Sequence, residues 1–298
     1  MKKHFIDLDN FTLNELRVIL NIARDIKLNP SQYTERLKQK SLGMLFEKQS
    51  NRTRVSFDIG MKKLGGNVIE LNKESIGFGQ RESESDVLKV LSTYIDCLMI
   101  RNDDHNKMKT FAEYNHLPII NGLSDYSHPC QILSDIFTIE EAKGSIENLL
   151  IVWCGDINNV LISLLQAAKI FNFQLHVASP ETILQLNQSI LNKYKCENIH
   201  FFHDPFKAIE KADCIMTDVW ISMGKKPSEA KILLFKDFQI NDYLLKKTNN
   251  DAIFMHCLPA CRNLEVTDSV IDGKKSIVWQ QAQNRLFVQQ SILNYCIT

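Results

Sequence analysis

The residues Ser50-Asn51-Arg52-Thr53-Arg54 combine hydroxyl and guanidinium groups in one short segment. An apolar run, Leu42 to Phe46, precedes them and predicts a buried strand, while apolar residues at helical spacing follow from Val55 to Leu64. The segment is therefore expected where a strand ends and a helix begins, a place that attracts anions. Guanidinium forks and hydroxyls favour a doubly charged phosphate-type ligand. The alternative is a solvated first turn in which Ser50 is an ordinary helix cap.

Length and composition limit the class of protein. The 298 residues predict about two domains, and 44% apolar with 23% charged residues is typical of soluble globular proteins. Lys plus Arg and Asp plus Glu both number 35, so no net field favours nucleic acid or membranes as partners. The N-terminal residues lack the apolar core of a secretory signal, and no apolar run is long enough to cross a membrane.

The cysteines indicate the compartment. Eight of them are scattered without a CxxC pair, several within apolar strand-like runs, which indicates reduced thiols in a cytoplasmic protein. Cys257 and Cys261 beside His256 raise the alternative of a zinc site, but no second ligand pair completes it. The sequence therefore predicts no metal and no organic cofactor.

Strand-like and helix-like segments alternate along the whole chain, which predicts an α/β fold of two similar-sized domains, each with a mainly parallel sheet flanked by helices. A polar, Gly-containing stretch at 143–147 is expected to separate a domain of residues 1–145 from one of residues 146–279. The helix predicted over 280–298 is expected to pack back on the first domain. The predicted strands cover residues 42–46, 67–71, 97–100, 119–120, 149–154, 175–178, 199–202, 214–217, 253–256 and 276–279.

Ligands of parallel α/β sheets collect outside the carboxyl ends of the strands. The apolar run at 97–100 delivers Arg101 to such an end, as the run at 42–46 delivers the hydroxyl and guanidinium segment. A turn from Gly155 to Asn159 also follows a strand, but it lacks the second and third glycines of a dinucleotide-binding fingerprint. These observations favour phosphate binding by arginines over dinucleotide binding.

Four later stretches complete a pattern with the segment Ser50 to Arg54. They are His128-Pro-Cys-Gln131, Asp218-Val-Trp-Ile-Ser222-Met223-Gly224, His256-Cys257-Leu258-Pro259 and Asn284-Arg285-Leu286. In this order and spacing, along essentially the whole chain, they resemble the aspartate/ornithine carbamoyltransferase family, and within it the ornithine-specific members. The resemblance implies transfer of the carbamoyl group of carbamoyl phosphate to the side-chain amine of L-ornithine, which gives L-citrulline and phosphate.

The same resemblance implies a role for each matched residue. Arg101, His128, Asp218 and Cys257 would act in catalysis. The first domain would bind carbamoyl phosphate through Ser50, Asn51, Arg52, Thr53, Arg101, His128, Gln131 and Arg285, with Arg54 in support. The second would bind L-ornithine through Asn159, Asp218, Ser222, Met223, Cys257 and Leu258. The active site would lie in the cleft between the domains, and family members form homotrimers whose active sites lie at subunit interfaces.

The residues alone leave alternatives open. His128 before a proline is also compatible with a helix cap, and Cys257 with a buried core thiol. Either Asp218 with Cys257 or the departing phosphate would take the proton of the amine. The acceptor is alternatively putrescine, N-acetylornithine or aspartate, and a binding homologue without turnover is a further alternative. The intact Arg52 and Arg101, together with the catalytic set, argue against that last class.

One loop departs from the family pattern. Gly77 stands where the family usually has a Gln that reaches the carbamoyl phosphate of a neighbouring subunit. Because Gly77 has no side chain, this contact is expected to be lost, unless Gln80 or Arg81 replaces it from a loop reshaped by its glycines.

Overall fold

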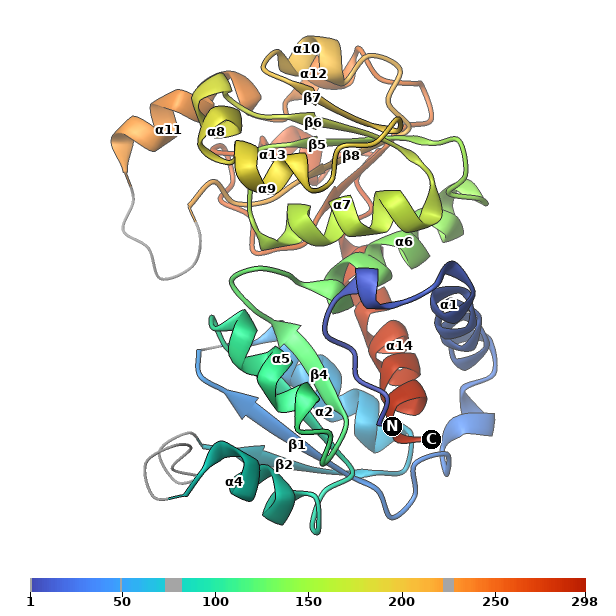
Figure 1. Cartoon of the computed structure of the whole chain (residues 1–298). Coiled ribbons are helices and arrows are strands. Elements are labelled where there is room, and N and C mark those ends of the chain that lie inside the picture. The colour runs from blue at the N-terminus through green and yellow to red at the C-terminus, as the bar shows by residue number, and fades with distance from the viewer. Residues whose placement is uncertain (1, 49, 73–81, 222–227) are drawn as a thin grey trace. The chain divides into compact units, whose positions relative to one another are not determined.

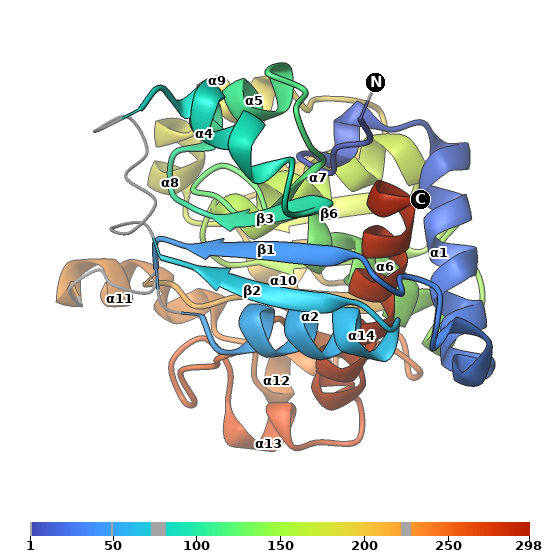
Figure 2. The same ribbon diagram turned by 90° about the horizontal axis from the view of Figure 1, so that it is seen from below.

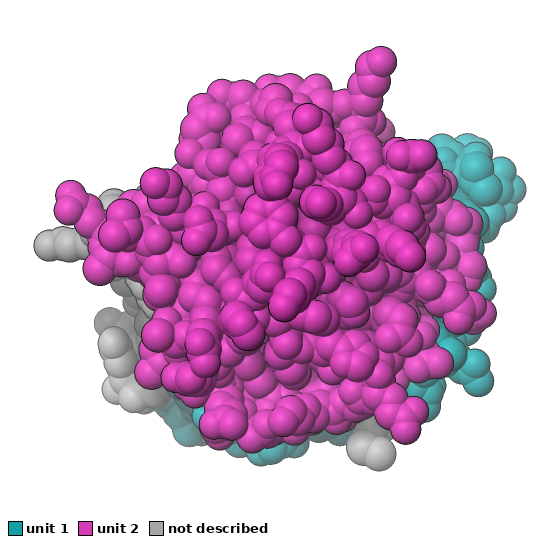
Figure 3. All heavy atoms as spheres, turned by 90° about the horizontal axis from the view of Figure 1, so that it is seen from above, with its two compact units in different colours: residues 1–134, 284–298 teal, residues 135–283 magenta. Residues whose placement is uncertain are grey.

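The computed structural model describes residues 2–48, 50–72, 82–221 and 228–298 and divides into two compact units (Figures 1 and 3). Unit 1 comprises Met1–Ser134 and Asn284–Thr298, and unit 2 comprises Asp135–Gln283. Two helices, α6 (Pro129–Lys143) and α14 (Val278–Ile297), contribute residues to both units. The division thus falls inside α6, whereas the sequence predicts a boundary just after it, at 143–147.

Unit 1 is built on a parallel sheet with the strand order β2-β1-β3-β4. Figure 2 shows α2 on one side of these strands and α4 and α5 on the other, as right-handed crossovers require. The strands are β1 (Ser41–Phe46), β2 (Asn67–Leu71), β3 (Cys97–Arg101) and β4 (Ile119–Leu123). The helices are η1 (Leu8–Asn10), α1 (Leu13–Leu28), η2 (Pro30–Tyr33), α2 (Arg52–Lys63), α4 (Glu84–Leu91) and α5 (His105–Glu113), joined by the ends of α6 and α14.

The apolar character of the central strands follows from this layering. Helices cover both faces, so successive side chains of β1 and β3 are buried whichever way they point. Leu45 and Leu98, on these two strands, pack in one cluster with Leu88 of α4 and Phe111 of α5. Phe46 pairs with Arg101 in register, so β1 and β3 end at the same edge of the sheet. This edge places the functional side chains described below.

Unit 2 is built on a second parallel sheet, with the order β7-β6-β5-β8-β9. Its strands are β5 (Leu150–Cys154), β6 (Gln174–Ala178), β7 (Ile199–Phe202), β8 (Cys214–Thr217) and β9 (Ile253–His256). Its helices are α7 (Asn159–Phe171), α8 (Glu181–Leu186), α9 (Gln188–Asn192), α10 (Pro205–Ala208), α11 (Glu229–Phe235), η3 (Lys236–Phe238), α12 (Asp242–Leu245) and α13 (Asp268–Ile271). Figure 1 shows α7 and α9 on one side of this sheet and α10 and α12 on the other.

The predicted α/β class, with two parallel sheets flanked by helices, is confirmed. The strand predicted over 276–279 is wrong. Ser276 forms only an isolated parallel bridge with Phe254, and α14 begins at Val278. The short apolar run Ile277-Val278-Trp279 has no periodicity that distinguishes a strand from a buried helix start. Within the described ranges, no helix is both long and apolar enough to cross a membrane.

Gly65→Ala is expected to destabilise the protein more than Gly144→Ala. Each glycine follows a helix and itself has a left-handed backbone conformation, with a φ of +84° at Gly65 and +88° at Gly144. A Cβ on Gly65 would lie 2.4 Å from the backbone oxygen of Thr34, whereas one on Gly144 would meet no described atom within 4 Å. We expect Gly144→Ala to lower the free energy of unfolding by about 1 kcal/mol and Gly65→Ala by about 1–3 kcal/mol more. Urea denaturation checks this, and equal losses would contradict the steric reason.

Candidate active site

The hydroxyl and guanidinium segment lies between the end of β1 and the start of α2, where the sequence predicts it. Arg101, the last residue of β3, donates from Nη1 to Ser50 Oγ at 3.2 Å and to Thr53 Oγ1 at 3.3 Å. Thr53 is buried and Ser50 half-buried. One guanidinium therefore ties together the two hydroxyls of the segment.

Arg285 joins this cluster from α14, far along the chain. It donates from Nη2 to Thr53 Oγ1 at 2.9 Å, so one hydroxyl oxygen accepts from both Arg101 and Arg285. A hydroxyl orients these cations without neutralising their charge. Burial chiefly, and then the charge of Arg52, lowers the pKa of Arg101. The cluster is thus a set of oriented positive groups that favours an anion.

His128 lies at the start of α6 and is buried. Burial lowers its pKa well below the usual value, and the charges of Arg285, Arg101 and Arg52 lower it further. The imidazole is therefore uncharged at neutral pH, and it can donate or accept a hydrogen bond without adding to the positive charge. Gln131, also buried, follows three residues later, on the same face of the helix.

The remaining predicted residues of unit 1 lie at the start of α2. Arg52 is its first residue and is half-buried, within electrostatic reach of Arg101 and His128. Asn51 is the exposed residue before it. Arg54 is exposed and forms an ion pair with Glu70 of β2, with 3.6 Å between Nη1 and Oε1. Unit 1 thus gathers the predicted phosphate-binding residues, while Arg54 pairs with an acid at its edge.

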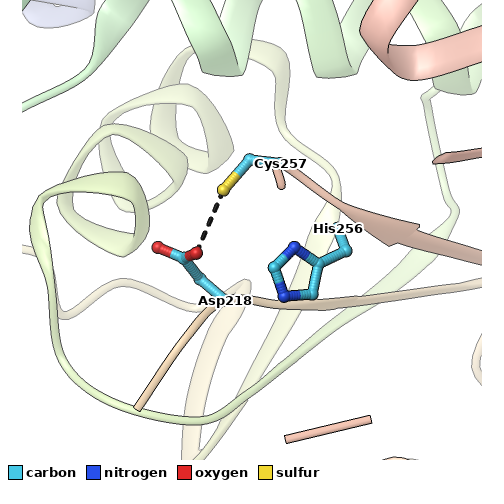
Figure 4. Close-up of side chains that lie close together, drawn as sticks. All are labelled: Asp218, His256 and Cys257. Carbon is cyan, nitrogen blue, oxygen red and sulfur yellow. Dashed lines mark hydrogen bonds between the residues drawn. The ribbon is translucent and has the colours of Figure 1, made fainter. Parts of the chain in front are cut away.

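Unit 2 carries a buried carboxylate at the corresponding edge of its own sheet (Figure 4). Thr217 of β8 pairs with His256 of β9, so the next residues, Asp218 and Cys257, leave the sheet side by side. The Cys257 thiol donates to Asp218 Oδ1 at 3.2 Å. Burial raises the pKa of Asp218, and nearby His256 and these hydrogen bonds oppose the shift. A buried carboxylate of this kind favours a cationic ligand.

The structure adds a residue that sequence reasoning missed. Asn158 donates from Nδ2 to Asp218 Oδ2 at 2.8 Å, while its Oδ1 accepts from the N–H groups of Val160 and Leu161. It is the N-cap of α7, and the predicted Asn159 is the half-buried first residue of that helix. The sequence signal was present, because Asn is a strong N-cap before an apolar helix.

A second missed residue is Glu265, which holds the loop after β9. His256 Nε2 lies 3.2 Å from Glu265 Oε1, and His256 Nδ1 accepts the N–H of Leu258 at 2.9 Å. Both side chains of the His256–Glu265 pair are fully buried. Leu258 has a left-handed φ of +59°, which the pair holds in place. No local pattern marks a lone Glu in such a loop.

Asp218, His256 and Cys257 are also the described residues that could hold a metal ion, with ligand atoms within 4.8 Å of one another. Their polar atoms are engaged with protein groups, since Cys257 donates to Asp218 and both ring nitrogens of His256 have partners. The group does not include Cys261, which the zinc alternative requires. The predicted Ser222 and Met223, and the loop residues Gly77, Gln80 and Arg81, lie outside the described residues.

Comparison with known proteins covers almost the whole chain. Residues 3–141 match the carbamoyl-P binding domain of aspartate/ornithine carbamoyltransferases, and residues 147–296 match their Asp/Orn binding domain. The chain is 45% identical to the ornithine carbamoyltransferase of Ruthia magnifica, over 100% of both chains. It is 42% identical to that of Mesorhizobium japonicum, over 99% of this chain and 98% of the relative. The solved ornithine carbamoyltransferase of Pyrococcus furiosus superposes with a TM-score of 0.90 at 39% identity, covering 99% of this chain and 97% of that one.

One parallel-sheet unit carries clustered guanidinium groups and the other a buried carboxylate. With the two domain matches, this arrangement defines the class of carbamoyl-group transferases. The chain belongs to the aspartate/ornithine carbamoyltransferase family. The resemblance that the sequence motifs carry is thereby confirmed.

Acidification is expected to destabilise the folded protein partly through His128. Its folded pKa is depressed, so between that value and the unfolded value of about 6.5 the unfolded state binds a proton that the folded state does not. The free energy of unfolding therefore rises with pH in this window, by at most about 1.4 kcal/mol per pH unit, and the contribution is complete above it. His128→Gln removes this titrating imidazole and should make the free energy of unfolding less dependent on pH.

Urea denaturation at several pH values between 5 and 7.5, in phosphate-free buffer, measures this slope. His203→Gln, which alters an exposed histidine, is the matched control. A slope that is unchanged in His128→Gln would contradict the assignment of a depressed pKa to this residue.

Proposed function

We propose that this chain transfers the carbamoyl group of carbamoyl phosphate to the side-chain amine of L-ornithine, giving L-citrulline and phosphate. The observation that carries the proposal is a pair of sites of opposite preference. Arg101 and Arg285 converge on Thr53 in unit 1, and Asp218 is buried in unit 2. The first suits a phosphate anion and the second an ammonium group. Citrulline formation from the two substrates is the direct test.

Unit 1 would bind carbamoyl phosphate. Ser50, Asn51, Arg52 and Thr53 would hold the phosphate, with Arg285 as a further contact, and Gln131 would receive the carbamoyl amide. Arg101 and the uncharged His128 would polarise the carbonyl oxygen. When the amine attacks, negative charge develops on that oxygen, and oriented donors stabilise it by about 3–4 kcal/mol each. The same positive groups make phosphate a better leaving group.

Unit 2 would bind L-ornithine through Asn159, Asp218, Ser222, Met223, Cys257 and Leu258. Asp218 supports this assignment best, because its carboxylate is buried and aligned by the side chains of Asn158 and Cys257. An ornithine ammonium group would supply the missing positive charge. The chemistry requires both substrates to meet at one carbamoyl carbon, so residues of both units would act together.

The amine must lose a proton before or during attack. Its unperturbed pKa is about 10.4, as for a Lys amine, and a neighbouring carboxylate stabilises its charged form further. The Cys257 thiol donates its proton to Asp218 and is therefore no base in this arrangement. Phosphate gains basicity as its bond to the carbamoyl carbon breaks. We therefore assign the role of final proton acceptor to the leaving phosphate. Asp218 and Cys257 would orient the amine.

Other acceptors are less compatible with this site. Aspartate carries a second carboxylate that the buried Asp218 would repel. Putrescine and N-acetylornithine retain an amine and differ at the other end of the molecule. Assays with each acceptor at equal concentration would rank them, and a chain that binds both substrates without producing citrulline would be a silent homologue.

We also infer a homotrimer that works in the cytoplasm. Val55 and Ile59 lie one turn apart on the exposed face of α2, and Ile69 is exposed on the edge strand β2. These exposed apolar side chains support an interface in which a second copy of the chain buries them. All eight cysteines lie in the described residues and none is in a disulfide there, which supports a reducing compartment. Light scattering should give three times the 34.4 kDa chain mass, and a monomer would overturn the assembly.

Arg52→Ala is expected to fold normally but to bind carbamoyl phosphate weakly. A charged hydrogen bond contributes about 1.5–3 kcal/mol, which corresponds to roughly a tenfold to hundredfold loss of affinity. Titration with carbamoyl phosphate and steady-state kinetics measure this. Lys63→Ala, which removes an exposed positive charge at the other end of α2, is the control. Near-normal affinity in Arg52→Ala would refute the assignment.

Asp218→Asn should weaken the binding of ornithine and leave the binding of carbamoyl phosphate intact. The variant keeps the shape of the side chain but removes the negative charge that would pair with the ornithine amine. We expect the KM for ornithine to rise at least tenfold while the affinity for carbamoyl phosphate stays within twofold. If carbamoyl phosphate binding were lost and ornithine binding kept, the roles assigned to the two units would be wrong.

A further inference from the structure

A buried chain of three polar side chains lies in unit 1, outside the residues assigned above. His105 Nε2 lies 2.8 Å from Asp7 Oδ2, and His105 Nδ1 lies 2.8 Å from Ser124 Oγ. Asp7, His105 and Ser124 are 2%, 6% and 0% exposed, so their polar groups depend on one another and not on solvent for hydrogen bonds. They come from the N-terminal segment, the first turn of α5 and the end of β4, which are distant in sequence.

Hydrogen bonds join the three side chains to one another and to the backbone of Ser127. Ser124 Oγ accepts the N–H of Ser127 at 3.0 Å, and its own proton faces either His105 Nδ1 at 2.8 Å or the Ser127 carbonyl at 3.3 Å. One proton therefore lies between Ser124 Oγ and His105 Nδ1, whichever of the two atoms donates it. On the other side of the ring, His105 Nε2 donates to the Asp7 carboxylate. Each of these contacts joins one donor to one acceptor.

Ser124 connects this chain to the backbone that carries His128. The Ser124 N–H donates at 2.9 Å to the Ser127 carbonyl, which belongs to the peptide bond between Ser127 and His128. On the other side, the His128 carbonyl accepts from the N–H groups of Gln131 and Ile132 in the first turn of α6. The backbone on both sides of His128 is therefore fixed, on one side by Ser124 and on the other by the helix.

The N-terminal segment is held against β4 at the same place. Phe5 exchanges backbone hydrogen bonds with Ile119 and Asn121, and Asn121 Nδ2 donates both to the Ile6 carbonyl and to Ser127 Oγ. Tyr126 packs against His105, with 4.9 Å between ring centroids. The loop from Ser124 to His128 is thus supported by the N-terminal segment through polar contacts rather than apolar packing alone.

We propose that Asp7, His105 and Ser124 form a hydrogen-bonded relay that positions His128 for carbamoyl transfer. This inference rests on the proposed function of His128. The three residues are positioning residues and not a hydrolytic triad, because Ser124 is fully buried and its oxygen already accepts from Ser127. The relay sets the orientation of the His128 backbone, and through it the direction in which the imidazole meets the ligand.

Two substitutions of the same histidine separate positioning from simple stability. The amide of Asn occupies the place of the histidine Nδ1, and that of Gln the place of Nε2. His105→Asn therefore keeps a partner for Ser124 and loses the one for Asp7, whereas His105→Gln keeps the partner for Asp7 and loses the one for Ser124. Each loses one buried hydrogen bond, and urea denaturation should show the larger loss of stability in His105→Asn, because this variant removes the partner of the buried Asp7 carboxylate.

The catalytic readouts should differ between the two variants. We expect His105→Gln to lower kcat at least tenfold and to weaken binding of inorganic phosphate, measured by calorimetry, at least fivefold, with the KM for ornithine within twofold of the wild type. His105→Asn should stay within threefold on every readout. Equal losses in both variants, or no loss in either, would overturn the relay. His4→Gln, which removes a different side-chain contact of the N-terminal segment to β4, should leave kcat unchanged.

A double-mutant cycle tests whether the effect passes through His128. In a His128→Ala background, adding His105→Gln should change phosphate binding and kcat by less than twofold. A further tenfold loss there would overturn the proposal. Citrulline formation by the wild type reports separately on the proposed function: if it were absent, the phosphate affinities of the same variants would still decide the relay.

Discussion

Positive groups held close together are the constraint on which unit 1 depends. Arg52, Arg101 and Arg285 all act on the buried His128, and their charges depress its pKa together with burial. Repulsion among such groups opposes folding, so the chain must orient them by other means. The Thr53 hydroxyl accepts from two of them, and an uncharged imidazole adds no further charge. The positive charge that remains favours a phosphate-type anion as ligand.

The parallel sheets make both sites possible by the same geometry. In each unit, neighbouring strands end at one edge and deliver their next residues side by side. Phe46 and Arg101 are paired at that edge in unit 1, as Thr217 and His256 are in unit 2. The two edges differ in charge, since one presents guanidinium groups and the other the buried carboxylate of Asp218. A single architectural rule thus places guanidinium groups at one edge and a buried carboxylate at the other.

Local sequence patterns predicted the parts of the fold that depend on local periodicity. The strand before Ser50, the helix after it and the delivery of Arg101 at a strand end all follow from apolar spacing and are present in the structure. The strand predicted over 276–279 failed because a three-residue apolar run, Ile277-Val278-Trp279, does not distinguish a strand from a helix start. Asn158 was missed beside Asn159 because spacing alone does not say which of two adjacent amides caps a helix and turns toward a strand end.

Glu265 and the Asp7–His105–Ser124 chain escaped prediction for a different reason. Asp7 and His105 are 98 residues apart, and only the folded sheet brings the N-terminal segment against β4 and α5. Apolar packing would fill the same space, but dispersion contacts do not fix the direction of a peptide plane, whereas hydrogen bonds do. Burying a carboxylate is costly unless it is hydrogen-bonded. The buried Asp7 is therefore best understood as the end of a hydrogen-bonded chain, whose other end fixes the backbone of the uncharged His128 beside the guanidinium groups of unit 1.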